Sequence, residues 1–326
     1  VLPWCPRCGT ALSSHELGQI DAYKDVKDLS VYVKFKVVGK ENTYILAWTT
    51  TPWTLPGNVA LAVGTDIDYM SVHVVKVHGD VPVMKEGETY IFAATEEADR
   101  RILGGPVVHP ENDQTRGVLT LEKGTVELEQ VRDFRGSDLI GFAYEPLYPF
   151  TAEQVSGEEK KKLEQNAYKV YAADFVTTTD GTGVVHTAVM YGQDDFELGN
   201  GVGLPKHHLV KPDGTFVSGT GFLEGRFVKD EAVAVDIIKD LAHRGLLFKK
   251  EKYEHSYPHC WRCQTPLLYY ARDSWYIRMS SLRAELVKEN ESINWEPSYI
   301  RDGRFGEWLK EIKDWAISRE RYWGTP

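Results

Sequence analysis

The sequence predicts an α+β fold, with an antiparallel, barrel-like β core, peripheral helices and a pair of metal-binding turns at its base. Three observations lead to this prediction. Strand-like runs are short and dense and are joined by turns that carry Gly and Pro, which is typical of a barrel or a sandwich. Amphipathic helical segments are few. All four cysteines fall in two Cys-x-x-Cys pairs near the two ends of the chain.

Alternating apolar and polar residues identify the strands. The clearest strand is 30–38, where apolar residues on one face alternate with Tyr and Lys on the other. Further strands are expected at 44–50, 69–77, 89–93, 125–132, 168–175 and 184–188. Helices are expected at 96–103, 195–198, 231–244, 276–289 and 304–313, and 156–165 is either a helix or a mobile tip.

Length and charge limit the function classes. A chain of 326 residues is long enough for one large or two unequal domains. Its net charge of −10 argues against wholesale coating of nucleic acid, although from Arg244 onward 15 Lys and Arg face 12 Asp and Glu. A phosphate-binding face is therefore expected in the last quarter. The chain carries no membrane-length apolar run and no signal peptide, so we expect a cytoplasmic protein without a membrane partner. It starts without methionine and stops at the expected beginning of an element, so we expect it to be a piece of a longer protein.

The cysteine pairs predict a structural zinc site. Cys5 and Cys8 form one pair and Cys260 and Cys263 the other, with 251 residues between the pairs. Two such turns can complete a tetrahedral four-sulfur site, which would then hold the two ends of the chain together. Two disulfides or redox pairs are the alternatives, and both fit poorly with so few cysteines in a large chain without a signal peptide.

A row of three threonines stands where a strand must end. Thr49, Thr50 and Thr51 follow an apolar run, and Pro52 has no amide hydrogen with which to continue a ladder. Leu55-Pro56-Gly57-Asn58 next reads as a tight turn. Taken alone, the stretch is a strand that runs into a turn and presents a polar shelf at its end.

A second polar stretch surrounds His186 and Asp195. Gly181 and Gly183 precede a strand but lack the third glycine and the helix of a dinucleotide fingerprint. Asp194 or Asp195 could simply cap a short helix, and a histidine on an apolar strand is most often a packed residue. No Gly-x-Ser-x-Gly elbow is present to indicate a serine nucleophile.

Together these motifs resemble the isoleucyl-tRNA synthetase family. The resemblance rests on Trp48–Asn58, Gly181–Ala188, Gly192–Phe196, the cysteine pairs and the closing Asp314–Pro326. It covers essentially the whole chain and corresponds to the editing insertion and the first residues of the returning catalytic half. The resemblance implies a zinc-knuckle arm at 1–27, an editing domain at 28–245, a second arm at 246–280 and a helical return at 281–326. His-Ile-Gly-His and Lys-Met-Ser-Lys-Ser do not occur, so ATP is expected only in the full-length enzyme.

The resemblance implies hydrolysis of valine misattached to the isoleucine tRNA, with isoleucine sterically excluded. One methylene in an apolar pocket discriminates by only ~1–3 kcal/mol, a limit for which the isoleucyl enzymes are the standard example, so a second pocket must remove the error. By motif, the catalytic candidates are Thr49, Thr50, Thr51, His186 and Asp195. The threonines would orient the ester, Asp195 would hold the α-ammonium and His186 would limit side-chain size. The same motifs supply Trp48, Thr54, Asn58 and Thr187 as substrate-binding candidates.

Two alternatives stay open at this point. The chain could be a noncatalytic, zinc-stabilised module that only binds the acceptor end of tRNA, or a pocket for free valine or valyl-adenylate. The expected partners are the isoleucine tRNA and the remainder of the synthetase, although a pocket for free valine or valyl-adenylate would not need tRNA for binding.

Overall fold

The computed structural model describes residues 1–81, 83–104, 107–108 and 115–320. The chain forms two compact units, 1–271 and 272–326. The predicted division of the first unit at residues 27 and 245 stays a prediction. Residues 321–326, which end both the predicted helical return and the closing motif, lie outside the described part of the chain.

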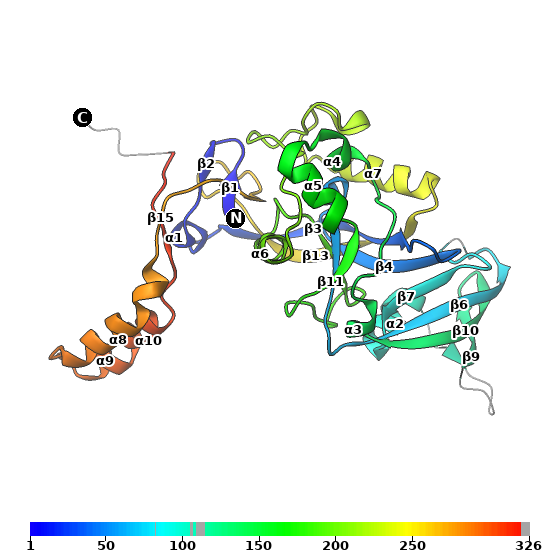
Figure 1. The fold of residues 1–326 in the computed structure, drawn as a ribbon, viewed down its shortest axis with the longest axis horizontal. Coiled ribbons are helices and arrows are strands. Elements are labelled where there is room, and N and C mark those ends of the chain that lie inside the picture. Colours follow the sequence, from blue (N-terminus) through cyan, green and yellow to red (C-terminus); the bar gives the residue numbers. More distant parts are fainter. Residues whose placement is uncertain (82, 105–106, 109–114, 321–326) are drawn as a thin grey trace. The chain divides into compact units, whose positions relative to one another are not determined.

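One large mixed sheet organises the first unit (Figure 1). Its strands follow the spatial order β11 (Lys169–Ala172), β5 (Ala60–Val63), β12 (Val184–Thr187), β4 (Thr43–Thr49), β7 (Thr89–Ala93), β6 (Asp68–Gly79), β10 (Gly124–Arg135), β9 (Arg116–Leu121) and β8 (Val107–Val108). Strand β3 (Tyr23–Lys36) joins at β4 and carries β13 (Leu247–Pro258) on its other side. In Figure 1, β6, β9 and β10 form the end of the sheet remote from β1 and β2.

The predicted antiparallel, barrel-like core is wrong, because the sheet is mixed and open, whereas the α+β class is correct. Three pairings are parallel: β11 with β5, β12 with β4, and β4 with β7. One edge of β4 is shared, because β7 pairs with Thr43–Ile45 and β12 pairs at Trp48. The sheet therefore branches at β4. Within the described residues the branches end at β8, β11 and β13, and these end strands do not pair with one another to close a barrel.

Most of the predicted elements form. Strand β7 and helix α2 (Glu96–Leu103) have the predicted bounds, and 156–165 is a helix, α5 (Gly157–Asn166). Strands β5, β9 and β13 were not predicted. The predicted helix at 276–289 begins only at Arg283, because Tyr276–Ile277 pairs instead with Trp315–Ala316.

The helices of the first unit are mostly short. They are α1 (Ser14–Leu17), α2, α3 (Gly136–Leu139), α4 (Phe150–Gln154), α5, α6 (Gln193–Val202) and α7 (Glu231–His243), with 3-10 turns η1 (Pro52–Gly57) and η2 (Gly221–Leu223). Helix α7 buries its apolar stripe, Val233, Ile237, Ile238 and Leu241, and contacts β3, β13 and η1. It therefore supports the turn that follows the threonines.

The base of the first unit is a small three-stranded sheet. Strand β1 (Leu2–Cys5) pairs with β2 (Thr10–Ala11) and with β14 (Leu268–Tyr270), all antiparallel. This pairing joins the start of the unit to its end and holds the two cysteine pairs together.

The second unit is helical over its described residues, apart from one short ribbon. It contains η3 (Met279–Leu282), α8 (Arg283–Ser292), α9 (Tyr299–Asp302) and α10 (Arg304–Lys310), and β15 (Tyr276–Ile277) pairs with β16 (Trp315–Ala316). Across the described parts of both units, no helix has the length and apolar character needed to span a membrane.

Candidate functional site

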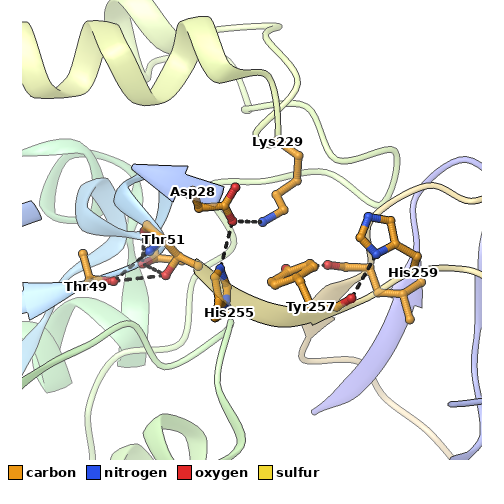
Figure 2. Close-up of polar contacts among 9 residues, drawn as sticks. Asp28, Thr49, Thr51, Lys229, His255, Tyr257 and His259 are labelled. Carbon is orange, nitrogen blue, oxygen red and sulfur yellow. Dashed lines mark hydrogen bonds and ion pairs between the residues drawn. The ribbon is translucent and has the colours of Figure 1, made fainter. Parts of the chain in front are cut away.

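The threonine row stands at the junction of β4 and η1. Thr49 is the last residue of β4, and its Oγ1 accepts a hydrogen bond of 3.1 Å from the amide of Thr51 (Figure 2). The hydroxyls of Thr49 and Thr51 lie 3.1 Å apart. Pro52 then opens the 3-10 turn, where its missing amide hydrogen costs nothing. The sequence thus ends the strand and fixes the hydroxyls in one local network.

This network continues into the interior through Thr54. Its Oγ1 donates to the Thr51 carbonyl at 2.8 Å and lies 2.8 Å from Nε2 of His186. On the other side of the ring, Nδ2 of Asn58 lies 3.4 Å from Nδ1, while Oδ1 of Asn58 accepts from the hydroxyl of Tyr144 at 2.7 Å. The structure therefore brings Thr51, Thr54, Asn58 and His186 into one hydrogen-bonded network.

The hydrogen bonds define the protonation state of His186. The amide nitrogen of Asn58 can only donate, so Nδ1 is the acceptor and Nε2 carries the proton toward Thr54. Burial lowers the pKa of His186 to about 4, so the ring is neutral near pH 7. Both ring nitrogens of neutral His186 form hydrogen bonds, to Thr54 and Asn58, so the ring holds Thr54 in place from behind. Neither nitrogen is free to accept a proton from a substrate or water.

Asp195 lies at the end of the strand that carries His186. Helix α6 begins at Gln193, and Asp195 in its first turn reaches back, where Oδ2 accepts the amide of Ala188 at 2.9 Å. Burial raises the pKa of Asp195 to about 7; the bond from Ala188 opposes the shift and the charge of Asp194 adds to it. Asp195 is thus a carboxyl group that titrates near neutral pH.

A pocket of about 330 Å³ opens beside the threonines. Thr50, Thr51 and Thr54 line it from one side and Tyr191 from another, and the rest of the lining comes from Tyr23, Trp53, Tyr269 and the end of β13 at His255, Ser256, Tyr257 and Pro258. His186 and Asp195 are not among the lining residues. His186 is buried behind Thr54, and Asp195 reaches the network only through β12.

The remaining substrate-binding candidates are mainly packing residues. The ring of Trp48 packs edge-on against Tyr253 at 5.1 Å between centroids. Thr187 is fully buried, and its hydroxyl has no hydrogen-bond partner among the described residues. Thr187 and Trp48 support the two strands that present the threonines and His186.

The glycines before β12 are explained by close packing. Gly181 and Gly183 both have φ of +70°, and a Cβ at Gly181 would lie 2.9 Å from the Trp48 ring. The Arg101 guanidinium of α2 donates to the carbonyls of Gly181 at 3.2 Å, Thr178 at 3.4 Å and Thr179. Sequence reasoning missed Arg101, and it missed Tyr144 and the β13 residues, because no motif or local pattern links them to the threonines.

The four cysteines form one cluster. The ligand atoms of Cys5, Cys8, Cys260 and Cys263 all lie within 4.8 Å of one another, and Sγ of Cys5 and Cys263 are 3.5 Å apart, too far for a disulfide. Tetrahedral bonds of ~2.3 Å place sulfurs ~3.8 Å apart, so this donor set suits a four-sulfur metal centre. Sγ of Cys5 also accepts the amide of Cys8 at 3.3 Å, as is usual in such turns.

A threonine network at the end of a buried strand, a pocket beside it and four clustered cysteines at the base define a domain of the class I tRNA synthetase type. The family model described as tRNA synthetases class I (I, L, M and V) matches residues 1–326, and the chain belongs to that family.

The curated relatives point to one branch of the family. Isoleucine–tRNA ligase of Clostridium novyi (strain NT) is 46% identical over 326 residues, which are 100% of this chain and 27% of the relative. The enzyme of Clostridium acetobutylicum is 47% identical with the same coverage. A solved structure described as GlLeuRS-CP1 aligns with 69% of this chain and 99% of its own at 14% identity and a TM-score of 0.44. The predicted resemblance to isoleucyl-tRNA synthetases is confirmed, and the chain spans about a quarter of the length of its curated relatives.

Proposed function

We propose that this chain is the editing part of an isoleucine–tRNA ligase, and that it hydrolyses valine misattached to the isoleucine tRNA. The observation that carries this proposal is the hydrogen-bonded network from Thr49 through Thr51 and Thr54 to His186, of which Thr51 and Thr54 line an open pocket. Such a network fixes the hydroxyls before a substrate arrives, so that no free energy is spent on ordering them during the reaction.

The reaction is ester hydrolysis by water. Water attacks the ester carbonyl carbon, the bond from that carbon to the ribose oxygen breaks, the ribose oxygen takes a proton, and the amino acid leaves as a carboxylate with release of a proton. Thr50 and Thr51, which line the pocket, orient the ester and the water. No side chain is assigned as a general base, since neutral His186 has both ring nitrogens engaged.

Asp195 and His186 are assigned to recognition. The role of Asp195 rests on the family motif, since its carboxyl group lies outside the lining of the threonine pocket. In that role an ionised Asp195 holds the α-ammonium group of the substrate through a charge-assisted contact, which fixes the carbonyl relative to water. His186 acts through Thr54, because its rigid ring prevents Thr54 from yielding to a larger side chain. Trp48, Asn58 and Thr187 position the two strands and the turn. Replacing His186 with Ala is expected to let the pocket accept isoleucine.

A zinc ion at Cys5, Cys8, Cys260 and Cys263 is proposed as a structural part of the same domain. Four thiolates would hold it, and when bound it supplies cross-linking of the two ends of the first unit and no reaction chemistry. Its ligands belong to a separate cluster from the threonines, and one of them, Cys5, is the last residue of β1 in the sheet β14–β1–β2.

The test is a deacylation assay on this chain with matched valyl- and isoleucyl-tRNA. We expect release of valine with isoleucyl-tRNA spared, loss of release on Asp195→Ala, and release of isoleucine by His186→Ala. A chain that binds valyl-tRNA without releasing valine, and that is indifferent to Asp195, would instead be a noncatalytic module for the acceptor end of tRNA.

A further inference from the structure

A second pocket, of about 240 Å³, adjoins the threonine pocket. The two share Thr50, Trp53 and Tyr257 in their linings. The second pocket extends from there between β3 and the start of α7, where it is lined by Asp28 and Lys229 (Figure 2). Nothing in the proposed hydrolysis uses these two residues.

Lys229 is a buried cation with unused hydrogen-bond donors. Its side chain is 9% exposed, and its Nζ lies 3.8 Å from the centroid of the Tyr257 ring and 3.9 Å from Oδ2 of Asp28. It makes no hydrogen bond with any described residue. An ammonium group has three donors, and the Lys229 Nζ is not fully sealed from solvent, so water or a ligand in the pocket must accept them. The same burial lowers the pKa of Lys229 to about 8.

Asp28 offers the opposite charge beside it. Its Oδ2 faces Nε2 of His255 at 3.2 Å, and no described residue donates to its other oxygen, Oδ1. One ammonium and one partly free carboxylate therefore stand about 4 Å apart in the same pocket. Figure 2 shows both groups directed into the space above Tyr257.

The rest of the lining is apolar or balanced in charge. The apolar residues are Val26, Leu29, Pro52, Trp53, Val228, Ala234 and Pro266. At the rim, Lys27 pairs with Glu254, and Asp230 accepts the amide of Ala232 as the cap of α7. Lys27 and Lys252 are balanced by Asp230 and Glu231, so the lining as a whole favours neither an anion nor a cation.

We propose that this second pocket binds a free α-amino acid with a small branched side chain, its carboxylate on Lys229, its ammonium on Asp28 and its side chain on the apolar wall. Neighbouring groups of opposite charge match the neighbouring charges of a zwitterion. The carboxylate of an amino acid exists only after its ester has been hydrolysed. The pocket therefore holds the product of the reaction proposed above rather than its substrate. The choice of a small branched side chain and the link to hydrolysis rest on the proposed function, whereas the match of the two charges to a zwitterion does not.

The experiment measures binding of L-valine to the whole 326-residue chain by ligand-observed NMR titration. Valinamide lacks the carboxylate and 3-methylbutanoate lacks the ammonium, so each tests one contact. We expect L-valine to bind at least about tenfold more tightly than either analogue, and Lys229→Met and Asp28→Asn each to weaken valine binding about tenfold or more. The control is Lys160→Met, because Lys160 is exposed on α5 and far in sequence from the pocket.

Asp195→Ala separates this pocket from the hydrolytic site. Valine binding that survives Asp195→Ala but is lost in Lys229→Met supports the proposal, even if the chain deacylates nothing. Binding that is equal in wild type and in Lys229→Met overturns it, as does the absence of binding in wild type, and neither result affects the deacylation assay. Circular dichroism melting of each variant checks that it folds, and Lys229→Arg, which keeps the charge, should retain more of the binding than Lys229→Met.

Discussion

Thr54 and His186 stand 132 residues apart in the chain, and a hydrogen bond of 2.8 Å joins Oγ1 of one to Nε2 of the other. The bond connects the turn after β4 to strand β12, the two segments whose motifs carry most of the family resemblance. It couples the position of Thr54 in the pocket to that of the buried His186. Substitution of His186 is therefore expected to alter which amino acid side chains the pocket admits.

Replacing Thr54 with Val tests this coupling. The change keeps the shape of the side chain but leaves Nε2–H of His186 without its acceptor in a buried site. We expect the free energy of unfolding to fall by about 1–3 kcal/mol and valine release to fall with it. Urea unfolding and the deacylation assay measure the two effects. Thr54→Ser, which keeps the hydroxyl, is the control and should retain most of both.

The raised pKa of Asp195 predicts a pH dependence of activity. If the carboxylate holds the α-ammonium group, deacylation should rise with pH through about 7 as Asp195 ionises. Asp195→Asn should abolish most of the activity at every pH. A wild-type profile that is flat between pH 6 and 8 would contradict the assigned role.

Asp195 also predicts an effect on stability, and its sign is opposite to that of a salt-bridged acid. The folded chain holds the proton more tightly than the unfolded chain, so the contribution of this group to stability decreases as pH rises from about 4 to about 7. Asp195→Asn keeps an acceptor for Ala188 without the charge and should remove this decrease. Thermal melting of both proteins at pH 5 and pH 8 measures it.

Removal of the metal is expected to loosen the base of the first unit. A chelator should lower the melting temperature, and elemental analysis should find one zinc per chain, lost in Cys5→Ser/Cys260→Ser. Both of these cysteines are buried. Retention of one zinc in the double variant would show that other residues bind it.

A buried ion pair in the sheet provides a test that does not involve the site. Lys34 and Glu88 are 2% and 10% exposed and lie 2.5 Å apart. Glu88→Leu leaves the Lys34 ammonium without its anionic partner and is expected to cost about 3–5 kcal/mol of unfolding free energy, much of which Lys34→Met/Glu88→Leu should recover. Lys36→Met, which breaks a solvent-exposed pair with Glu145, should have little effect on urea unfolding.

Arg101 is expected to affect catalysis through the loop that it holds. Arg101→Met frees three carbonyl groups in 178–181 and should lower the rate of valine release more than the affinity for tRNA. Arg100→Met is the control, since Arg100 is exposed and its ion pair among the described residues is with Glu96 one turn earlier. Equal rates in the two variants would assign Arg101 to the fold alone.

The sequence was informative where the physical cause is local. Alternation identified β3, the apolar residues of 231–244 and the stop at Gly245 identified α7, and the cysteine spacing identified the cluster. Long-range pairing was out of reach. The parallel pairing of β4 with β7 and β12 joins segments that no local pattern relates, and the alternating charges of 247–258 concealed β13.

The residues of the candidate site also differ in whether the sequence alone could identify them. The threonines, His186 and Asp195 were identified through motifs of the family. Asp28 and Lys229 belong to no motif and stand 201 residues apart in the chain, so only the structure places them in one pocket. Tyr144 was missed for the same reason, because its bond to Asn58 spans 86 residues.

The meeting of Cys5 and Cys8 with Cys260 and Cys263 has an architectural consequence. The segment between them starts and ends at neighbouring points in space. A protein that contains it as an insertion therefore does not need to displace its own backbone. Replacing residues 9–259 with a few glycines should leave the fold of such a surrounding protein intact. For the same reason, the segment can be inserted into another protein at a site where two chain ends lie equally close.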